Sequence, residues 1–261
     1  MTPRPAVQAL LPYLRPSALK IGPLTFHLFG ALVMIAVLGG GALIGHRAEK
    51  QGLSRHIASR MYVCMVLAGF LCAHIAKTLQ DGTVFADPTI LFRVWEGLYS
   101  FGGIAGGILG LFCFAWFARL SRATVWRFLD VAAWSFPFAW MFGRLGCSFA
   151  HDHPGLPTAS WLGVQFPDGV RRFDLGLVEF LFTVLVAAAF LALDRRQRPT
   201  GFYFGLLLLV YGPFRLFLDG LHAERPHGLL SSDGCFSLAA ALAGAAVLAL
   251  IYHHSRSGGG L

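Results

Sequence analysis

The feature that most constrains the fold of this chain is a series of seven long apolar stretches. Each has about 20 residues, the length that an α-helix needs to cross the hydrocarbon of a bilayer. They cover residues 24–45, 61–79, 101–118, 125–143, 174–193, 201–218 and 236–252. Their polarity does not alternate as in a membrane β-barrel, and an open strand leaves backbone groups unsatisfied in lipid. We therefore predict an all-α integral membrane protein with seven transmembrane helices, forming one transmembrane domain over residues 1–261.

The composition supports a membrane protein and excludes most soluble classes. Hydrophobic residues make up 56% of the chain and charged residues only 13%, whereas a soluble domain carries roughly 25% charged residues. The net charge of +8 would suggest nucleic acid in a soluble protein. Here the charges lie in short connections between apolar stretches, where they set orientation and contact anionic headgroups. We expect membrane lipids as partners and no nucleic acid.

Basic residues indicate the orientation, because Lys and Arg are concentrated in cytoplasmic connections. In this chain they are more frequent in the first, third and fifth connections than in the others. The first group consists of Arg47, Lys50, Arg55, Arg60, Arg119, Arg122, Arg127, Arg195, Arg196 and Arg198, and the other connections carry Arg93, Arg171, Arg172 and Arg225. We predict that the N-terminus lies outside and that the C-terminus is cytoplasmic.

Glycines and cysteines leave two questions open. Gly102, Gly103 and Gly106 belong to a small-residue pattern in the third stretch, which favours close helix packing but also lets a ligand approach the backbone. Cys147 and Cys235 both fall on the predicted outer side, where a disulfide is compatible with an oxidising compartment. The chain has no paired-cysteine motif with zinc spacing.

Polar residues gather near the predicted outer ends of the stretches, where an ionisable side chain is costly and so indicates a site. They are His27, Arg93, Trp95, Glu96, Arg144, His151, Asp152, His153, Tyr211, Arg215, Asp219, His222, Glu224, Arg225 and His227. Each has a structural interpretation, such as an i, i+4 ion pair between Arg215 and Asp219. Taken together, two arginines among carboxylates and histidines predict a site for an anionic headgroup. Adjacent residues do not converge easily on one ion, so the run 151–153 does not lead us to predict a metal site.

Four stretches of the chain resemble those of prolipoprotein diacylglyceryl transferases. In order, they are IGPLTFHLFG at 21–30, DPTILFRVWEG at 87–97 with SFGG at 100–103, GRLG at 143–146, and YGPFR at 211–215 followed by Asp219. The resemblance implies seven spans in the bacterial inner membrane, with the site toward the outer face. It also implies transfer of a diacylglyceryl group from phosphatidylglycerol to the lipobox cysteine of prolipoproteins. The reaction releases glycerol phosphate, and no cofactor is expected.

The chain also departs from the family pattern at several positions. Residues that match are His27, Arg144, Tyr211 and Arg215. Those that differ are Gly102 in place of a histidine, Phe29 in place of a tyrosine, Cys147 in place of an asparagine, and Asp152 and Asp219 in place of glutamates. The arginines are therefore retained, while the family histidine, a proposed proton-handling group, is lost.

The resemblance and the residue chemistry together suggest roles. Arg144 and Arg215 suit a phosphate and the charge of its leaving group. An acceptor thiol reacts as the thiolate, and a nearby base assists its deprotonation. Our expected catalytic residues are Arg144, Arg215, His151, Asp152, His153 and Tyr211, and the expected substrate-binding residues are His27, Gly102, Gly103 and Asp219. Two alternatives stay open: a divergent paralogue acting on another lipid or acceptor, and a non-catalytic lipid-binding or transport protein.

Overall fold

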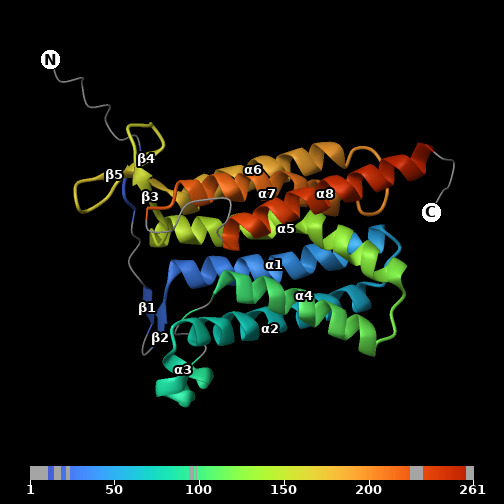
Figure 1. Ribbon diagram of the computed structural model, residues 1–261, viewed down its shortest axis with the longest axis horizontal. Coiled ribbons are helices and arrows are strands. Elements are labelled where there is room, and N and C mark those ends of the chain that lie inside the picture. Colours follow the sequence, from blue (N-terminus) through green and yellow to red (C-terminus); the bar gives the residue numbers. More distant parts are fainter. Residues whose placement is uncertain are drawn as a thin grey trace. The chain divides into compact units, whose positions relative to one another are not determined.

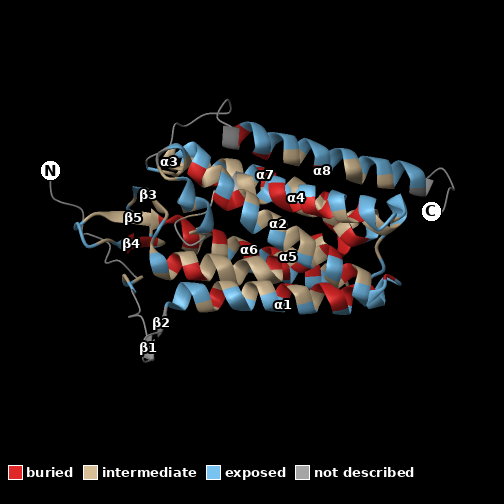
Figure 2. Cartoon of the chain, turned by 90° about the horizontal axis from the view of Figure 1, so that it is seen from below, coloured by how far each residue is buried: buried red, intermediate tan, exposed pale blue. Residues whose placement is uncertain are grey.

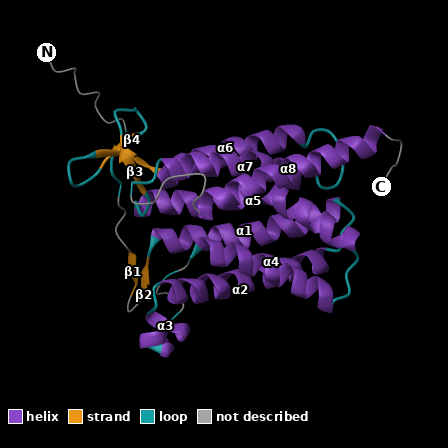
Figure 3. Ribbon diagram, viewed as in Figure 1, coloured by secondary structure: helices purple, strands orange, loops and turns teal. Residues whose placement is uncertain are grey.

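The apolar stretches fold as long helices in the computed structural model, which describes residues 11–14, 19–21, 24–93, 97, 99–223 and 232–256 (Figure 1). These helices are α1 (Leu28–Lys50), α2 (Arg55–Gln80), α4 (Ser100–Phe117), α5 (Arg122–Ala150), α6 (Leu175–Leu193), α7 (Phe202–Gly220) and α8 (Ser232–Arg256). A short helix α3 (Thr83–Ala86) and a 3-10 helix η1 (Pro88–Phe92) lie between α2 and α4. The described part of the chain is therefore largely helical, as predicted (Figure 3).

The helix ends differ from the predicted stretches in two informative places. Helix α1 begins at Leu28 and not at residue 24, because β2 (Leu24–Phe26) pairs antiparallel with β1 (Leu19–Ile21). Helix α5 continues to Ala150, well past the apolar stretch that ends at residue 143. Arg144 and Cys147 are therefore held on a helix, which fixes the direction of their side chains.

Many apolar side chains of the helices are exposed, as expected of a protein solvated by lipid. Among the described residues, five helical segments are long and apolar enough to cross a membrane: Leu28–Lys50, Arg55–Gln80, Leu175–Leu193, Phe202–Gly220 and Gly234–His254. The segment Gly102–Phe117 of α4 is apolar but shorter. Side chains such as Leu38, Leu185 and Leu242 are exposed, and exposed residues recur along the long helices (Figure 2). Apolar surface on this scale is unusual for a soluble monomer. The chain is a multi-pass integral membrane protein.

The chain divides into two compact units, and the first contains the predicted site. This unit comprises Met1–Gly40 and Ala132–Leu261. Its buried core joins Ala133 of α5, Phe190 of α6 and Tyr203 of α7. The hydroxyl of Tyr203 donates a hydrogen bond to Asp194 Oδ1 at 3.0 Å. These contacts hold α5, α6 and α7 together at the end of α6 that leads into the connection to α7.

The second unit, Gly41–Val131, is built on close packing of α2 against α4. A Cβ added at Gly102 would lie 2.5 Å from Ala76 Cβ and 2.6 Å from the carbonyl oxygen of Cys72. Gly106 meets α2 just as closely, with a built Cβ only 2.4 Å from Cys72 Cβ. Helix packing therefore accounts for these two glycines of α4.

A small sheet connects α5 to α6, which the prediction of an all-α fold did not include. Strands β3 (Pro154–Pro157), β4 (Gly163–Gln165) and β5 (Arg171–Asp174) form an antiparallel sheet in the order β3-β5-β4. Strand β5 ends at Asp174, whose side chain accepts a hydrogen bond from Leu177 N and so caps α6. The sheet thereby places the first turns of α6 beside the last turns of α5.

Candidate functional site

The centre of the site is Glu179, a carboxylate on the second turn of α6. Only 1% of this residue is exposed, so its charge requires partners. Gly176, one turn earlier, allows α6 to approach α5, because a Cβ there would lie 2.9 Å from Cys147 Cβ. This close approach brings the Glu179 carboxylate to the α5 residues that precede Cys147.

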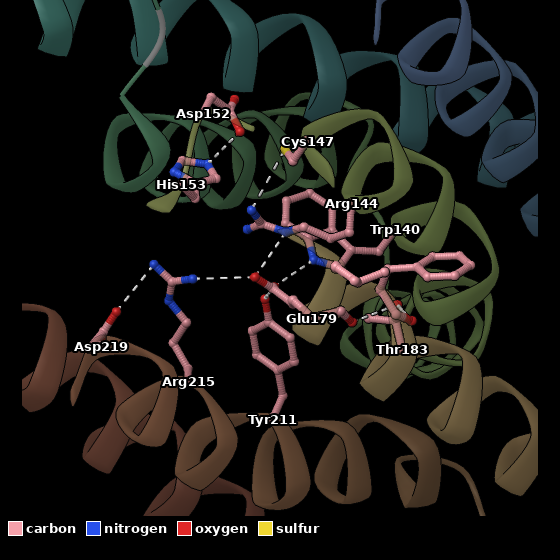
Figure 4. A network of polar contacts seen from close by, with 12 residues as sticks. Trp140, Arg144, Cys147, Asp152, His153, Glu179, Thr183, Tyr211, Arg215 and Asp219 are labelled. Atoms are coloured by element: carbon pink, nitrogen blue, oxygen red, sulfur yellow. Dashed lines mark hydrogen bonds and ion pairs between the residues drawn. The ribbon is translucent and has the colours of Figure 1, made fainter. Parts of the chain in front are cut away.

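Two arginines from different helices converge on the same oxygen of Glu179 (Figure 4). Nε of Arg144 on α5 lies 3.0 Å from Glu179 Oε2. Nη1 of Arg215 on α7 donates to Oε2 at 3.4 Å. Nη2 of Arg215 lies 3.3 Å from Oδ1 of Asp219, which is the i, i+4 pair considered from the sequence. The structure thus brings Arg144, Arg215 and Asp219 into one cluster.

Two aromatic donors complete the shell around Glu179. Trp140 Nε1 donates to Oε1 at 3.0 Å, and the hydroxyl of Tyr211 donates to the same oxygen. The guanidinium of Arg144 lies over the Trp140 ring, 4.7 Å from its centroid. Both carboxylate oxygens are therefore occupied, and the direction of Arg144 is fixed by the carboxylate and by the ring. Tyr211, a predicted catalytic residue, belongs to this cluster.

The charges in the cluster balance, which makes its burial tolerable. Arg144 and Arg215 contribute two positive charges, and Glu179 and Asp219 contribute two negative ones. The side chains of Arg144 and Arg215 are 12% and 24% exposed. Each guanidinium carries five N–H groups, and the contacts named above engage only some of them. The cluster therefore retains hydrogen-bond donors suited to an anionic ligand.

The side chains of the three residues after α5, residues 151–153, point in two directions. His151 has a left-handed backbone, with φ of 51°, and its side chain turns away from Arg144. Its Nδ1 contacts Asp174 Oδ2, and its Nε2 lies 3.2 Å from the carbonyl oxygen of Leu14. The ring also stacks on Tyr13 at 3.9 Å. His151 thus ties the N-terminal segment 11–14 to the end of β5.

Asp152 and His153 lie on the side of Cys147 instead (Figure 4). Asp152 Oδ1 and His153 Nε2 are 3.7 Å apart. Nη1 of Arg144 lies 3.9 Å from Cys147 Sγ and donates toward it. Cys147, Asp152 and His153 therefore border the arginine cluster through Arg144. Both Cys147 and Cys235 are free thiols, so the disulfide left open by the sequence is not formed.

The other predicted residues lie elsewhere or outside the described residues. His27 is exposed just before α1, and its carbonyl oxygen accepts the first hydrogen bond of that helix from Ala31. Gly103 lies against α2, where an added Cβ would be 3.5 Å from Ala73 Cβ. The predicted polar residues that fall outside the described residues are Trp95, Glu96, Glu224, Arg225 and His227.

Comparison with known proteins shows the family of the chain. A model of the prolipoprotein diacylglyceryl transferase family matches residues 16–251. The chain belongs to this family. A relative from Pseudoalteromonas atlantica, named phosphatidylglycerol–prolipoprotein diacylglyceryl transferase, is 32% identical over 87% of this chain and 82% of its own length. Relatives of the same name from Symbiobacterium thermophilum and Glaesserella parasuis are 27% and 28% identical, over 82% and 94% of this chain and 84% and 96% of their own lengths.

Sequence reasoning about this family member missed Glu179. The residue is in the fifth apolar stretch, outside the motifs that carried the resemblance and away from the polar residues near the ends of the stretches. One signal was available, because a lone carboxylate within an apolar run is costly unless it has a buried partner. Trp140, which lies one turn before Arg144 on α5, was missed for the same reason: an aromatic residue in an apolar stretch has no distinctive pattern.

Proposed function

We propose that this chain transfers the diacylglyceryl group of phosphatidylglycerol to the lipobox cysteine thiol of prolipoproteins. The reaction forms a thioether and releases glycerol phosphate. The observation that carries the proposal is the convergence of Arg144 and Arg215 on Glu179, within a unit of largely apolar helices. The names of the relatives support the same substrates.

The arginine cluster suits the phosphate of the lipid and of the leaving group. Guanidinium groups bind phosphate through paired N–H donors and stay charged when desolvated. Glu179 holds Arg144 and Arg215 in place before the lipid binds, so little reorganisation is needed when charge develops on the departing oxygen. Asp219 supports Arg215 on its other side. We assign Tyr211 to the same task through its hydrogen bond to Glu179.

Activation of the acceptor thiol falls to the residues on the Cys147 side of Arg144. A base within reach of the thiol speeds formation of the thiolate. Among the three candidates at 151–153, His151 is engaged by Asp174 and Leu14. His153, with Asp152 beside it, is the candidate that borders the arginine cluster. His27 and Asp219 remain proposed substrate-binding residues, whereas we propose that Gly102 and Gly103 serve the packing of α4 on α2.

We place the site toward the outer face of the bacterial inner membrane, in a topology of seven spans with an external N-terminus and a cytoplasmic C-terminus. In the first unit, Glu179 lies near the start of α6 and Arg215 near the end of α7. The connection between these helices, at their other ends, carries three arginines, Arg195, Arg196 and Arg198. The preference of basic residues for the cytoplasm supports this orientation.

The test uses purified chain in detergent, phosphatidylglycerol and a lipobox peptide, with mass spectrometry of the thioether adduct. We expect Arg144→Ala and Arg215→Ala to abolish the adduct while the protein remains folded. Arg196→Ala, an exposed arginine outside the cluster, serves as the matched control and should retain transfer. Full transfer by both cluster variants would refute the phosphate-binding role.

A divergent paralogue is the second candidate, favoured by Gly102 and Cys147 at the positions of the family histidine and asparagine. It would keep the lipid site and use another lipid or acceptor. Complementation of a bacterial strain depleted of its own transferase separates the two. Rescue supports prolipoprotein transfer, whereas a folded chain that retains phosphatidylglycerol but neither rescues growth nor forms the adduct favours another acceptor or a non-catalytic lipid-binding protein.

A further inference from the structure

We propose that Cys147, Asp152 and His153 form a binding site for a divalent transition-metal ion, with Zn²⁺ as the best-suited ion. The ligand atoms of these three residues all lie within 4.8 Å of one another. The role that we give the ion rests on the proposed function, whereas its binding does not.

The backbone explains how these three side chains meet. Helix α5 ends at Ala150, and His151 N donates to the carbonyl oxygen of Cys147 at 2.9 Å, closing the last turn. The left-handed backbone of His151 then turns the chain back. Asp152 and His153 return over the turn that carries Cys147, while the His151 side chain leaves toward Asp174. Cys147 on α5 is therefore the third ligand, in place of His151. The site does not require the three adjacent residues 151–153 to bind the same ion.

The donor set matches the preference of zinc. Zn²⁺ is bound by thiolate, imidazole and carboxylate groups at about 2.0–2.3 Å in a tetrahedron, which puts the ligand atoms about 3.3–3.6 Å apart. Asp152 Oδ1 and His153 Nε2 are already 3.7 Å apart. These two side chains are 43% and 32% exposed, so solvent and an ion can reach their ligand atoms from outside.

The local charges also suit a divalent cation. The Cys147 thiolate and the Asp152 carboxylate carry two negative charges, which balance a bound Zn²⁺. The ion and its two anionic ligands together are neutral, so they do not repel the guanidinium of Arg144, whose Nη1 lies 3.9 Å from Cys147 Sγ.

Three protein ligands leave the fourth position of a tetrahedral site open, as in catalytic zinc sites. An ion held by Cys147, Asp152 and His153 would act there as a Lewis acid that favours the thiolate form of the acceptor. The sulfur then forms a bond to the glyceryl carbon as the bond from that carbon to the phosphate oxygen breaks. The electron pair leaves with glycerol phosphate, held by Arg144 and Arg215. In this arrangement His153 would assist deprotonation of the acceptor thiol through the ion that it helps to hold.

The binding experiment uses the full chain without a polyhistidine tag, dialysed against zinc alone, with bound metal measured by mass spectrometry. We expect one zinc ion per chain. Cobalt substituted for zinc should give a thiolate-to-cobalt charge-transfer band. Cys147→Ser and His153→Ala should lose both the bound zinc and the band, with helix content checked by circular dichroism. Cys113→Ser, an exposed thiol on α4, should keep both.

Failure of the metal site is distinguishable from failure of the proposed function. No zinc retained by the wild-type chain, or zinc and the cobalt band unchanged in both variants, would overturn the site. Transfer by the zinc-free chain at the rate of the zinc-loaded chain would overturn the catalytic role of the ion. Transfer that survives in both Arg144→Ala and Arg215→Ala would refute the proposed function, while the zinc measurements would still report on the site independently.

Discussion

Nε of Arg144 lies 3.0 Å from Oε2 of Glu179, so the anion-binding side chain on α5 is held by a carboxylate of α6. Arg215 on α7 contacts the same oxygen at 3.4 Å. Three helices thus share one buried charge centre. The carboxylate prevents repulsion between the two guanidinium groups, and an arriving phosphate finds both already in place.

Removing this carboxylate should be costly for both stability and activity. We expect Glu179→Ala to lower the free energy of unfolding by about 3–5 kcal/mol, because it leaves buried arginines without their partner. Glu179→Gln keeps the shape but not the charge, and should abolish most diacylglyceryl transfer while losing less stability. Denaturant unfolding in detergent and the adduct assay measure the two effects.

Glu49→Gln is the matched control, since Glu49 is 52% exposed and its ion pair with Arg55 spans 4.0 Å. Exposed pairs of this kind contribute about 0–1 kcal/mol, so this variant should behave as wild type. Wild-type transfer by Glu179→Gln would show that the arginines do not need the carboxylate for catalysis.

The helices were predictable from the sequence because hydropathy over about 20 residues is a strong signal. The contents of the site were only partly predictable. Motif positions pointed to Arg144 and Arg215, but Glu179 lies in an apolar run without a motif. The sheet of residues 154–174 was hidden because its strands have only three or four residues. His151 and His153 were equally good candidates for the base, because both lie close to Arg144 along the chain. Only the left-handed backbone at His151, which the structure shows, distinguishes their positions.

The contact between His151 and Asp174 should be structural. Asp174 is 1% exposed and also caps α6. We expect His151→Ala to lower the free energy of unfolding by about 1.5–3 kcal/mol, the usual contribution of a hydrogen bond to a charged group. Asp174→Asn should cost a similar amount, and the double variant should cost less than the sum, because the two residues share one interaction.

Comparing His151→Ala with His153→Ala shows which of the two histidines acts on the acceptor thiol. His153 is partly exposed, so its removal should leave unfolding nearly unchanged but reduce transfer strongly. Per folded molecule, His151→Ala should reduce transfer far less. If His151→Ala instead abolished transfer without destabilising the fold, His151 and not His153 would be the residue that acts on the thiol.

Restoring the family histidine at Gly102 should not restore a family-like site. The first carbon of any side chain there meets Ala76 Cβ at 2.5 Å and the Cys72 carbonyl oxygen at 2.6 Å. We expect Gly102→Ala to cost about 1–3 kcal/mol through overpacking and Gly102→His to cost more. In Gly39→Ala, no atom lies within 4 Å of the added carbon, so this control should be neutral or slightly stabilising. Thermal unfolding in detergent ranks the three, and a Gly102→His variant as stable as wild type would refute the packing argument.

His74 on α2 should hold the segment that leads into α4. It is 1% exposed, and its Nε2 lies 2.9 Å from the carbonyl oxygen of Ile90, while its Nδ1 lies 3.2 Å from that of Gly97. His74→Phe keeps an aromatic ring of similar size and removes both ring nitrogens, and with them the contacts to Ile90 and Gly97.

We expect hydrogen exchange in His74→Phe to rise across residues 87–93 and at Gly97, because the two long-range contacts of His74 to Ile90 and Gly97 are gone. Exchange in α6 and α7 of the other unit should stay unchanged. His74→Gln places an amide NH₂ group near the same carbonyl oxygens and should recover part of the protection against hydrogen exchange. Unchanged exchange over 87–93 in His74→Phe would mean that the backbone of η1 and its Asp87 cap, which accepts from Thr89 N at 3.0 Å, hold η1 without the histidine.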